Sequence, residues 1–178
     1  MKEFQTFIAS SIVTLKNERN NIGAFAYIIN QKLRELYDIQ LKIFECEFYP
    51  NHIEDEAKQK KYDAELCKSQ CFVCMFKDEA STTGKRVGKF TINECKLAYS
   101  QQITMRVFIQ NTKSDLIDEV NNSLENPDIP TEFYNSINDI KIFILTSCLQ
   151  YFGLKNELKI DDEGTVFLSG KPYLNLND

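Results

Sequence analysis

The chain has 178 residues, a formal net charge of −5, 43% hydrophobic residues and 26% charged residues, which is typical of a water-soluble globular protein. It contains no apolar run of about 18 residues, the length that a membrane span needs, and its N-terminus carries no signal-peptide core. The balance of 21 basic and 26 acidic residues argues against a general nucleic-acid binder. We therefore expect a cytoplasmic protein with no membrane and no direct nucleic-acid partner.

The first half of the chain alternates between strand-like and helix-like segments. Residues 4–9 and 41–48 are short and apolar, and predict two strands. Residues 54–70 are rich in charge and predict a mainly solvated helix, whereas residues 71–77 are apolar on both faces and predict a central strand. Helical spacing between the first two strands predicts a helix of about 22 residues. Its apolar stripe consists of Leu15, Ile22, Ala26, Ile29, Leu33 and Leu36.

The second half continues the alternation after a polar loop over residues 78–89. We expect a helix over 90–102 and a strand over 104–110, then a short helix capped by Ser114 and a fifth strand over 132–137. A broadly apolar helix follows and is closed by Gly153. Finally, two short apolar segments, 158–160 and 166–168, flank an acidic turn and predict a hairpin.

This alternation predicts an α/β fold, a flavodoxin-like three-layer sandwich. Its sheet is expected to be mostly parallel and five-stranded, in the order 2-1-3-4-5, with helices on both faces. We assign residues 1–153 to this domain. Residues 154–178 form a C-terminal extension that is either a hairpin packed on the domain or the start of a further region. Ligands of such folds bind at the carboxyl ends of the strands, so the loops after the first three strands are the expected site.

The six cysteines do not indicate a metal site or a disulfide framework. Cys71 and Cys74 lie three apart on a predicted strand and point to opposite faces, so they cannot share one metal ion. The chain has a single histidine, His52, and a zinc site built from Cys and His needs more ligands than this pattern offers. We expect reduced cysteines that are mostly part of the core.

Familiar phosphate-binding motifs are missing from the expected site. Gly84-Lys85-Arg86 is followed by neither Ser nor Thr and lacks the preceding glycine of a Walker A loop. No G-x-G-x-x-G sequence follows the first strand either. The basic loop is explained equally well as a lid over a ligand and as an ordinary solvated loop.

Glu94 lies about one turn into the helix that follows the third strand, at the expected ligand edge. Thr91-x-x-Glu94 has the spacing of a capping box, in which Glu94 bonds back to the Thr91 backbone, and spacing alone favours this structural role. Successive helical side chains diverge by about 100°, so Cys95 is expected to face the core. A cysteine nucleophile with His52 as its base is therefore not favoured.

Two segments resemble bacterial TIR-like (Toll/interleukin-1 receptor-like) domains. Phe7-Ile8-Ala9-Ser10-Ser11, followed by Glu18-Arg19, is similar to their opening, and the segment Gly88 to Cys95 is similar to the one that carries their catalytic glutamate. The order of elements from Phe4 to about Gly153 matches too. The resemblance implies that Glu94 is the catalytic residue of an enzyme that cleaves the nicotinamide–ribose bond of NAD⁺ by hydrolysis, cyclisation or ADP-ribosyl transfer. It also implies self-association, a signalling or effector role in bacterial anti-phage defence, and a further domain or effector protein as a partner.

One carboxylate is chemically sufficient for this reaction. Glycosyl transfer passes through an oxocarbenium-like state that a carboxylate stabilises, and nicotinamide leaves NAD⁺ as a neutral molecule that needs little acid help. NAD⁺ is then the substrate, and neither a cofactor nor a metal is required. From the loop positions we expect stacking and polar contacts with the substrate. The candidates are Ser10 and Ser11 for ribose or phosphate oxygens, Phe48 or Tyr49 for a ring, and Lys85, Arg86 or Lys89 for the pyrophosphate.

Two other functions stay open. The chain could be a non-enzymatic TIR-like module that self-associates or senses a nucleotide. It could also resemble the nucleoside deoxyribosyltransferases, which share a similar fold and use a glutamate against an N-glycosidic bond.

Overall fold

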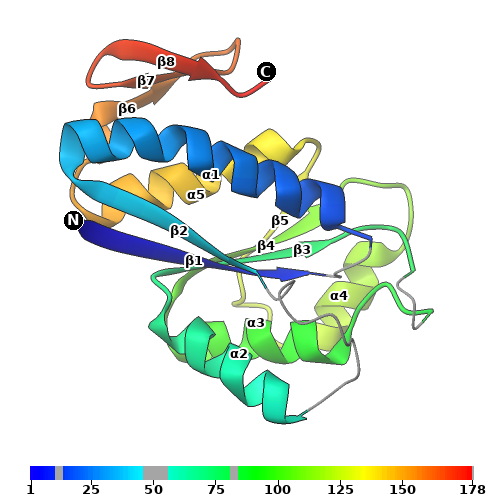
Figure 1. Cartoon of the computed structure of the whole chain (residues 1–178). Helices are drawn as coiled ribbons and strands as arrows, with labels where there is room; N and C mark the ends of the chain where they lie inside the picture. The colour runs from blue at the N-terminus through cyan, green and yellow to red at the C-terminus, as the bar shows by residue number, and fades with distance from the viewer. Residues whose placement is uncertain (11–13, 46–55, 81–83, 178) are drawn as a thin grey trace.

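A central parallel sheet organises the molecule, as the computed structural model in Figure 1 shows. The structure describes residues 1–10, 14–45, 56–80 and 84–177. The sheet has five strands in the order β2-β1-β3-β4-β5, and every neighbouring pair is parallel. The strands are β1 (Lys2–Ser10), β2 (Ile39–Glu45), β3 (Cys71–Phe76), β4 (Thr104–Gln110) and β5 (Thr131–Tyr134). The predicted flavodoxin-like α/β fold is therefore confirmed.

Helices cover both faces of the sheet and complete three layers (Figure 1). One face carries α1 (Lys16–Tyr37) and α5 (Ile137–Tyr151). The other face carries α2 (Glu56–Lys68), α3 (Lys89–Ser100) and α4 (Leu116–Leu124). The helices α1 to α4 each connect two strands of the parallel sheet, which is the crossover that parallel pairing requires, and α5 leads from β5 to the C-terminal segment.

The core has two halves, one on each side of the sheet, and β3 contributes to both. All six of its side chains are buried, which confirms the prediction of a central strand. Cys71 and Val73 face the α1–α5 side, whereas Phe72 and Cys74 face the α2–α4 side. Cys71 and Cys74 therefore lie on opposite faces, as the alternation of a strand requires.

The apolar stripe of α1 is confirmed except at its end. Ile22, Ile29 and Leu33 have no measurable exposure, but Leu36 is 38% exposed. The last turn lies at the margin of the core, where Tyr37 packs against the cluster instead. The helix then ends at Asp38, whose φ of 55° places it in the left-handed region.

A second, antiparallel sheet follows the α/β domain. After the short 3₁₀ helix η2 (Lys155–Glu157), it is formed by β6 (Leu158–Ile160), β7 (Thr165–Leu168) and β8 (Lys171–Asn175). The predicted hairpin is present, and β8 adds a third strand that the pattern did not predict. This C-terminal sheet lies over α1 and α5 (Figure 1).

Its contacts with the helices are both apolar and polar. Val166, Leu168 and Leu176 are buried in the same cluster as α1 and α5, and the Tyr173 hydroxyl donates to the Ile28 carbonyl over 2.9 Å. The extension is therefore packed on the domain. No helix in the described parts of the chain is long and apolar enough to cross a lipid bilayer.

Candidate functional site

The carboxyl edge of the sheet has a topological switch point at β1. This strand lies between β2 and β3, and the helices that follow β1 and β2 pack on opposite faces. Ligands of open α/β folds bind in the crevice that such a reversal leaves. The chain segments that leave β1, β2 and β3 therefore define the place where functional side chains are sought.

Glu94 on α3 is a buried carboxyl group near this edge. Its side chain is only 6% exposed, and its Oε1 accepts a hydrogen bond of 2.9 Å from Nε2 of Gln59 on α2. The helix begins at Lys89 with Gly88 as the N-cap and has no side-chain cap bond. Thr91 is thus the third residue of the helix and not its cap, so the capping-box role of Glu94 is wrong.

Gln59 also links Glu94 to a second carboxyl group. Its Nε2 donates over 2.9 Å to Oδ1 of Asp63, one turn further along α2. A primary amide has two N–H groups, so both donors of Gln59 are engaged by these two acids. We call Glu94, Gln59 and Asp63 the acid cluster.

The sequence offers little sign of the acid cluster. Gln59 and Asp63 lie in the charged stretch that was expected to be a solvated helix face. The spacing of four residues is the one local signal, because it places the two side chains on the same face of α2. Their meeting with Glu94 depends on how α2 and α3 pack together.

The environment of Glu94 shifts its acidity towards neutral pH. Burial raises its pKa to about 7; the Gln59 hydrogen bond opposes the shift, and the negative charge of Asp63 adds to it. A carboxyl group whose pKa lies near 7 exchanges a proton readily at physiological pH. Such perturbation by burial and a charged neighbour is common at functional sites.

Cys95, the neighbour of Glu94, faces the core as expected. It has no measurable exposure and lies against Cys74 of β3, whose pKa is raised well above its usual value by burial and by the contact with Cys95. Buried thiols in such surroundings are poor nucleophiles. His52, the base once considered for Cys95, lies outside the described residues.

Ser10, the last residue of β1, contacts a buried arginine. Its Oγ accepts a hydrogen bond of 3.2 Å from Nη1 of Arg19 on α1, and Arg19 is 1% exposed. Arg19 was not among the expected site residues. The signal for it was its position four residues after Leu15, on the otherwise apolar stripe of α1.

The basic residues after β3 have different surroundings. Lys85 and Lys89 are exposed. Arg86 is held by three carboxylates, those of Asp78, Asp115 and Glu119, with hydrogen bonds of 2.8, 2.8 and 2.9 Å. A contact between Arg86 and a substrate pyrophosphate would require an exchange of these partners.

The remaining expected contacts cannot be located. Ser11, Phe48 and Tyr49 lie outside the described residues. Of the expected residues, the structure therefore places Ser10 at the end of β1, Lys85 and Arg86 between β3 and α3, Lys89 at the start of α3 and Glu94 in the second turn of α3.

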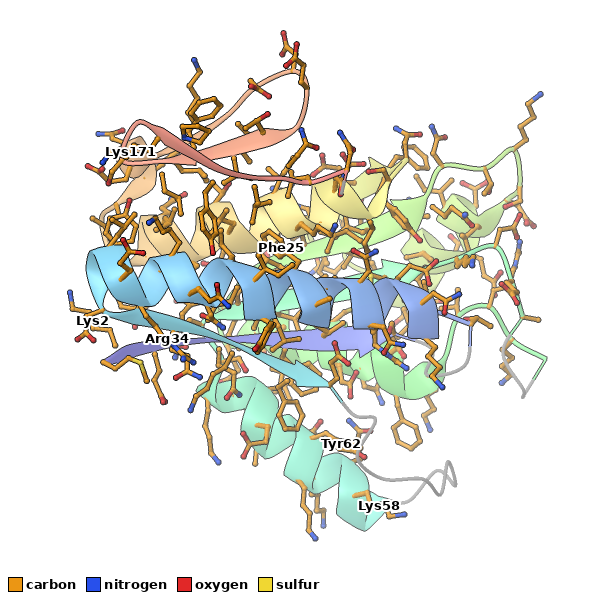
Figure 2. The ribbon with its side chains drawn as sticks, turned by 45° about the horizontal axis from the view of Figure 1, so that its top comes forward. Lys2, Phe25, Arg34, Lys58, Tyr62 and Lys171 are labelled. Carbon is orange, nitrogen blue, oxygen red and sulfur yellow. The ribbon has the colours of Figure 1, made fainter. Side chains whose placement is uncertain are left out.

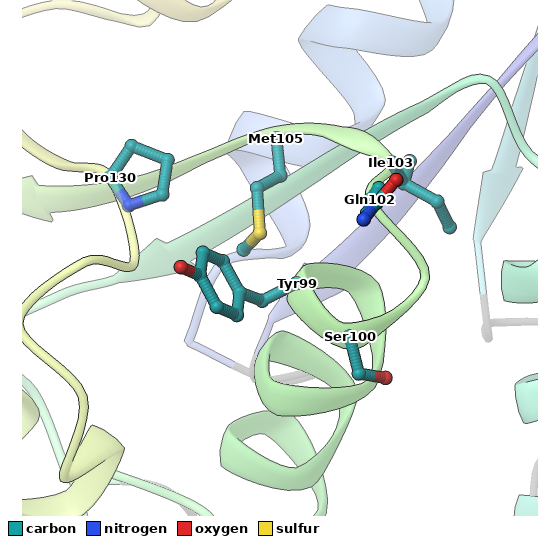
Figure 3. Close-up of a pocket in the computed structure, with 6 residues that line it drawn as sticks. All are labelled: Tyr99, Ser100, Gln102, Ile103, Met105 and Pro130. Atoms are coloured by element: carbon teal, nitrogen blue, oxygen red, sulfur yellow. The ribbon is translucent and has the colours of Figure 1, made fainter.

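A pocket of about 480 Å³ is found at the opposite edge of the sheet. Figure 3 shows Tyr99, Met105 and Pro130 around it. Met105 lies near the start of β4 and Pro130 just before β5, so this pocket is far along the strands from their carboxyl ends. The described residues that line it carry no formal charge.

Comparisons with known proteins identify no family and give two distant structural similarities. No protein-family model and no curated protein matches the chain. Among solved structures, a 3-dehydroquinate dehydratase-like protein from Bifidobacterium longum is 8% identical with a TM-score of 0.44, and the match covers 85% of this chain and 98% of that one. A conserved protein from Enterococcus faecalis V583 is 16% identical with a TM-score of 0.38, over 81% and 98% of the two chains. At these values neither likeness bears on function.

Proposed function

We propose that the chain is a TIR-like enzyme that consumes NAD⁺ by cleaving its nicotinamide–ribose bond, with Glu94 as the catalytic carboxyl group. The observation that carries the proposal is the buried carboxyl of Glu94, with a pKa of about 7, near the carboxyl edge of an open α/β sheet. The resemblance of the segment from Gly88 to Cys95 to the catalytic segment of TIR-like domains supports the same residue. The proposal includes self-association, a cytoplasmic location and a role in anti-phage signalling.

The chemistry follows from the two charge states of Glu94. In the carboxylate form it stabilises the positive charge that develops on the ribose as the glycosidic bond breaks and nicotinamide leaves with the bonding electrons. In hydrolysis, a water molecule attacks the ribose carbon and releases a proton, which the same carboxylate accepts. Gln59 acts as a positioning residue, since its amide holds Glu94.

Replacing Glu94 with Gln tests the proposal. Gln has the same size as Glu and keeps an oxygen that can accept the hydrogen bond from Gln59. It cannot carry the negative charge. We expect Glu94→Gln to lower NAD⁺ turnover by about 100-fold or more. Chromatography of the reaction products of concentrated protein measures this loss and identifies ADP-ribose, a cyclic product or a conjugate.

Glu163→Gln is the matched control, because it makes the same chemical change at an exposed position in the turn between β6 and β7. It should turn over NAD⁺ like the wild type. Equal NAD⁺ consumption by the wild type and Glu94→Gln would contradict the proposal. A concentrated wild-type protein that consumes no NAD⁺ would contradict it as well.

A nucleoside deoxyribosyltransferase-like activity is a second candidate, and Asp63 favours it. A neutral nucleoside needs an acid to protonate its departing base, and Glu94 with its pKa of about 7 suits that role, while Asp63 supplies a second carboxyl group linked to it through Gln59. A deoxynucleoside offered with a different free base tests this function. Base exchange that is lost in Asp63→Asn, without NAD⁺ loss in the wild type, would favour it over the first proposal.

A further inference from the structure

A second pocket lies on the other side of the sheet from the acid cluster. It has a volume of about 440 Å³ and lies between α1, the start of α5 and the end of β8, within the size range of small-molecule sites. Phe25, Ile28 and Leu174 give it apolar walls, and four asparagines line it as well. The sheet and the layer of α1 and α5 separate it from Glu94.

Lys141 is the one formally charged residue among the described residues that line this pocket. It is 7% exposed. Its Nζ lies 5.8 Å from the centre of the Phe25 ring and donates to the Leu176 carbonyl over a long 3.3 Å. An ammonium group has three N–H donors, so the contacts found within the described part of the chain leave it under-used.

Within the described part of the chain, no counter-charge compensates this lysine. Its surroundings lower the pKa of Lys141, and burial is the sole cause. Across residues 1–10, 14–45, 56–80 and 84–177, no carboxylate forms an ion pair with it. A buried cation without a partner is costly, and an anionic group in the pocket would offset that cost.

Asn138 provides a second group without a partner in the same pocket. Its Nδ2 donates to Oδ1 of Asn177 over 2.8 Å, but its own Oδ1 is buried and has no hydrogen-bond partner among the described residues. An unpaired buried acceptor is rare. A small rotation of the Asn138 side chain would present this oxygen to a donor in the pocket.

We propose that this pocket binds a small organic carboxylate that carries an N–H or O–H donor beside the acid group and an apolar body. The carboxylate contacts Lys141, the donor contacts Oδ1 of Asn138, and the body packs on Phe25 and Leu174. A single cation among neutral amides suits a monoanion better than a phosphate, which usually meets several positive groups. This inference is independent of the function proposed for Glu94.

Anthranilate is a suitable probe, because it combines a carboxylate, a neighbouring amino group and an aromatic ring, and it is fluorescent. We expect saturable binding to the full chain with a Kd on the order of 1 mM, as suits a ligand of this size. Benzoate, which lacks the donor, should compete more weakly, and aniline, which lacks the carboxylate, should not compete. Amide chemical shifts of residues 137–141 and 174–177 locate the bound probe.

Lys141→Met tests the charged contact. Methionine has a similar length and an apolar character suited to burial, so the variant should fold and be at least as stable as the wild type. We expect its affinity for anthranilate to fall at least about tenfold. Lys171→Met is the matched control, because Lys171 lies at the exposed start of β8 (Figure 2) and does not line the pocket, and it should bind like the wild type.

The outcomes separate clearly. Binding that is lost in Lys141→Met and kept in Lys171→Met supports the proposal. It is overturned if Lys141→Met, folded by circular dichroism, binds anthranilate as tightly as the wild type. It is also overturned if none of the three probes gives a saturable signal at millimolar concentration, which would mean that the pocket holds water alone.

Discussion

Glu94 combines burial with a nearby negative charge and one neutral hydrogen-bond donor. Gln59 offers the Glu94 carboxyl a single N–H group, and within the described residues this is the one hydrogen bond that the carboxyl oxygens accept. This environment is less favourable to the charged form than water, so the pKa rises to about 7. Burial and the nearby charge suit Glu94 to proton transfer. The same two features destabilise the folded state above neutral pH, where Glu94 is ionised.

This destabilisation predicts a pH-dependent difference in stability. The pKa of Glu94 rises from 4.5 to about 7 on folding, so between these pH values the folded state keeps a proton that the unfolded state has released. The free energy of unfolding should fall by about 3 kcal/mol as the pH rises through this window. Glu94→Gln carries no such charge, so we expect it to be more stable than the wild type at about pH 8 and similar at about pH 4.

Urea unfolding of both proteins at the two pH values measures this effect. Other carboxyl groups titrate in both proteins, and the difference between the variant and the wild type isolates Glu94. A difference that does not change with pH would show that Glu94 is ionised normally in the folded protein.

At the scale of elements, Arg86 ties the segment after β3 to the start of α4. Its guanidinium contacts Asp115, the N-cap of α4, Glu119 within α4, and Asp78, two residues after β3. The hydrogen bonds hold the pKa values of Asp78 and Asp115 below their usual range. The contribution of these pairs is therefore present at neutral pH and is lost as the pH falls through the lowered pKa values.

We expect Arg86→Met to loosen this region. Without the guanidinium, three neighbouring carboxylates repel one another, so amide hydrogen exchange should become faster over residues 84–88 and in the first turn of α4. Added salt should reduce the difference from the wild type, because it screens charges at the surface. Lys85→Met, at the exposed neighbouring position, is the control. If both variants exchange at the wild-type rate, the three contacts do not restrain the loop.

At the scale of the whole molecule, the C-terminal sheet shares a core with the α/β domain. Val166, Leu168 and Leu176 are buried against α1 and α5, and hydrogen bonds connect Tyr173 with Ile28 and Tyr37 with Ser169. Shared apolar burial couples the folding of the two parts. We therefore expect them to unfold together.

Leu168→Ala tests this coupling. Because Leu168 is 1% exposed, its truncation should lower the free energy of unfolding by about 2–5 kcal/mol, in a single transition. Leu36→Ala makes the same change at a leucine that is 38% exposed and should cost less than about 1 kcal/mol. Two separate urea transitions, only one of them shifted, would show that the C-terminal sheet is an independent unit.

The sequence by itself determined the fold, because hydrophobic periodicity is a local property that reports which side of each element is buried. It identified the strand order, the central position of β3 and the opposite faces of Cys71 and Cys74. It also drew attention to Glu94, through a resemblance between short segments. It failed where two local explanations competed: Thr91 and Glu94 have the spacing of a capping box, yet the helix begins at Lys89.

Only the tertiary structure decided what surrounds the functional groups. The meeting of Glu94 with Gln59 and Asp63, the three carboxylates around Arg86, and the burial of Lys141 beneath β8 all join residues that are distant in the chain. No local sequence pattern predicts these contacts, because they depend on how the helices pack on the sheet and on each other. The pKa of a side chain depends on such contacts, so the chemistry expected of Glu94 and of Lys141 could be inferred only from the folded molecule.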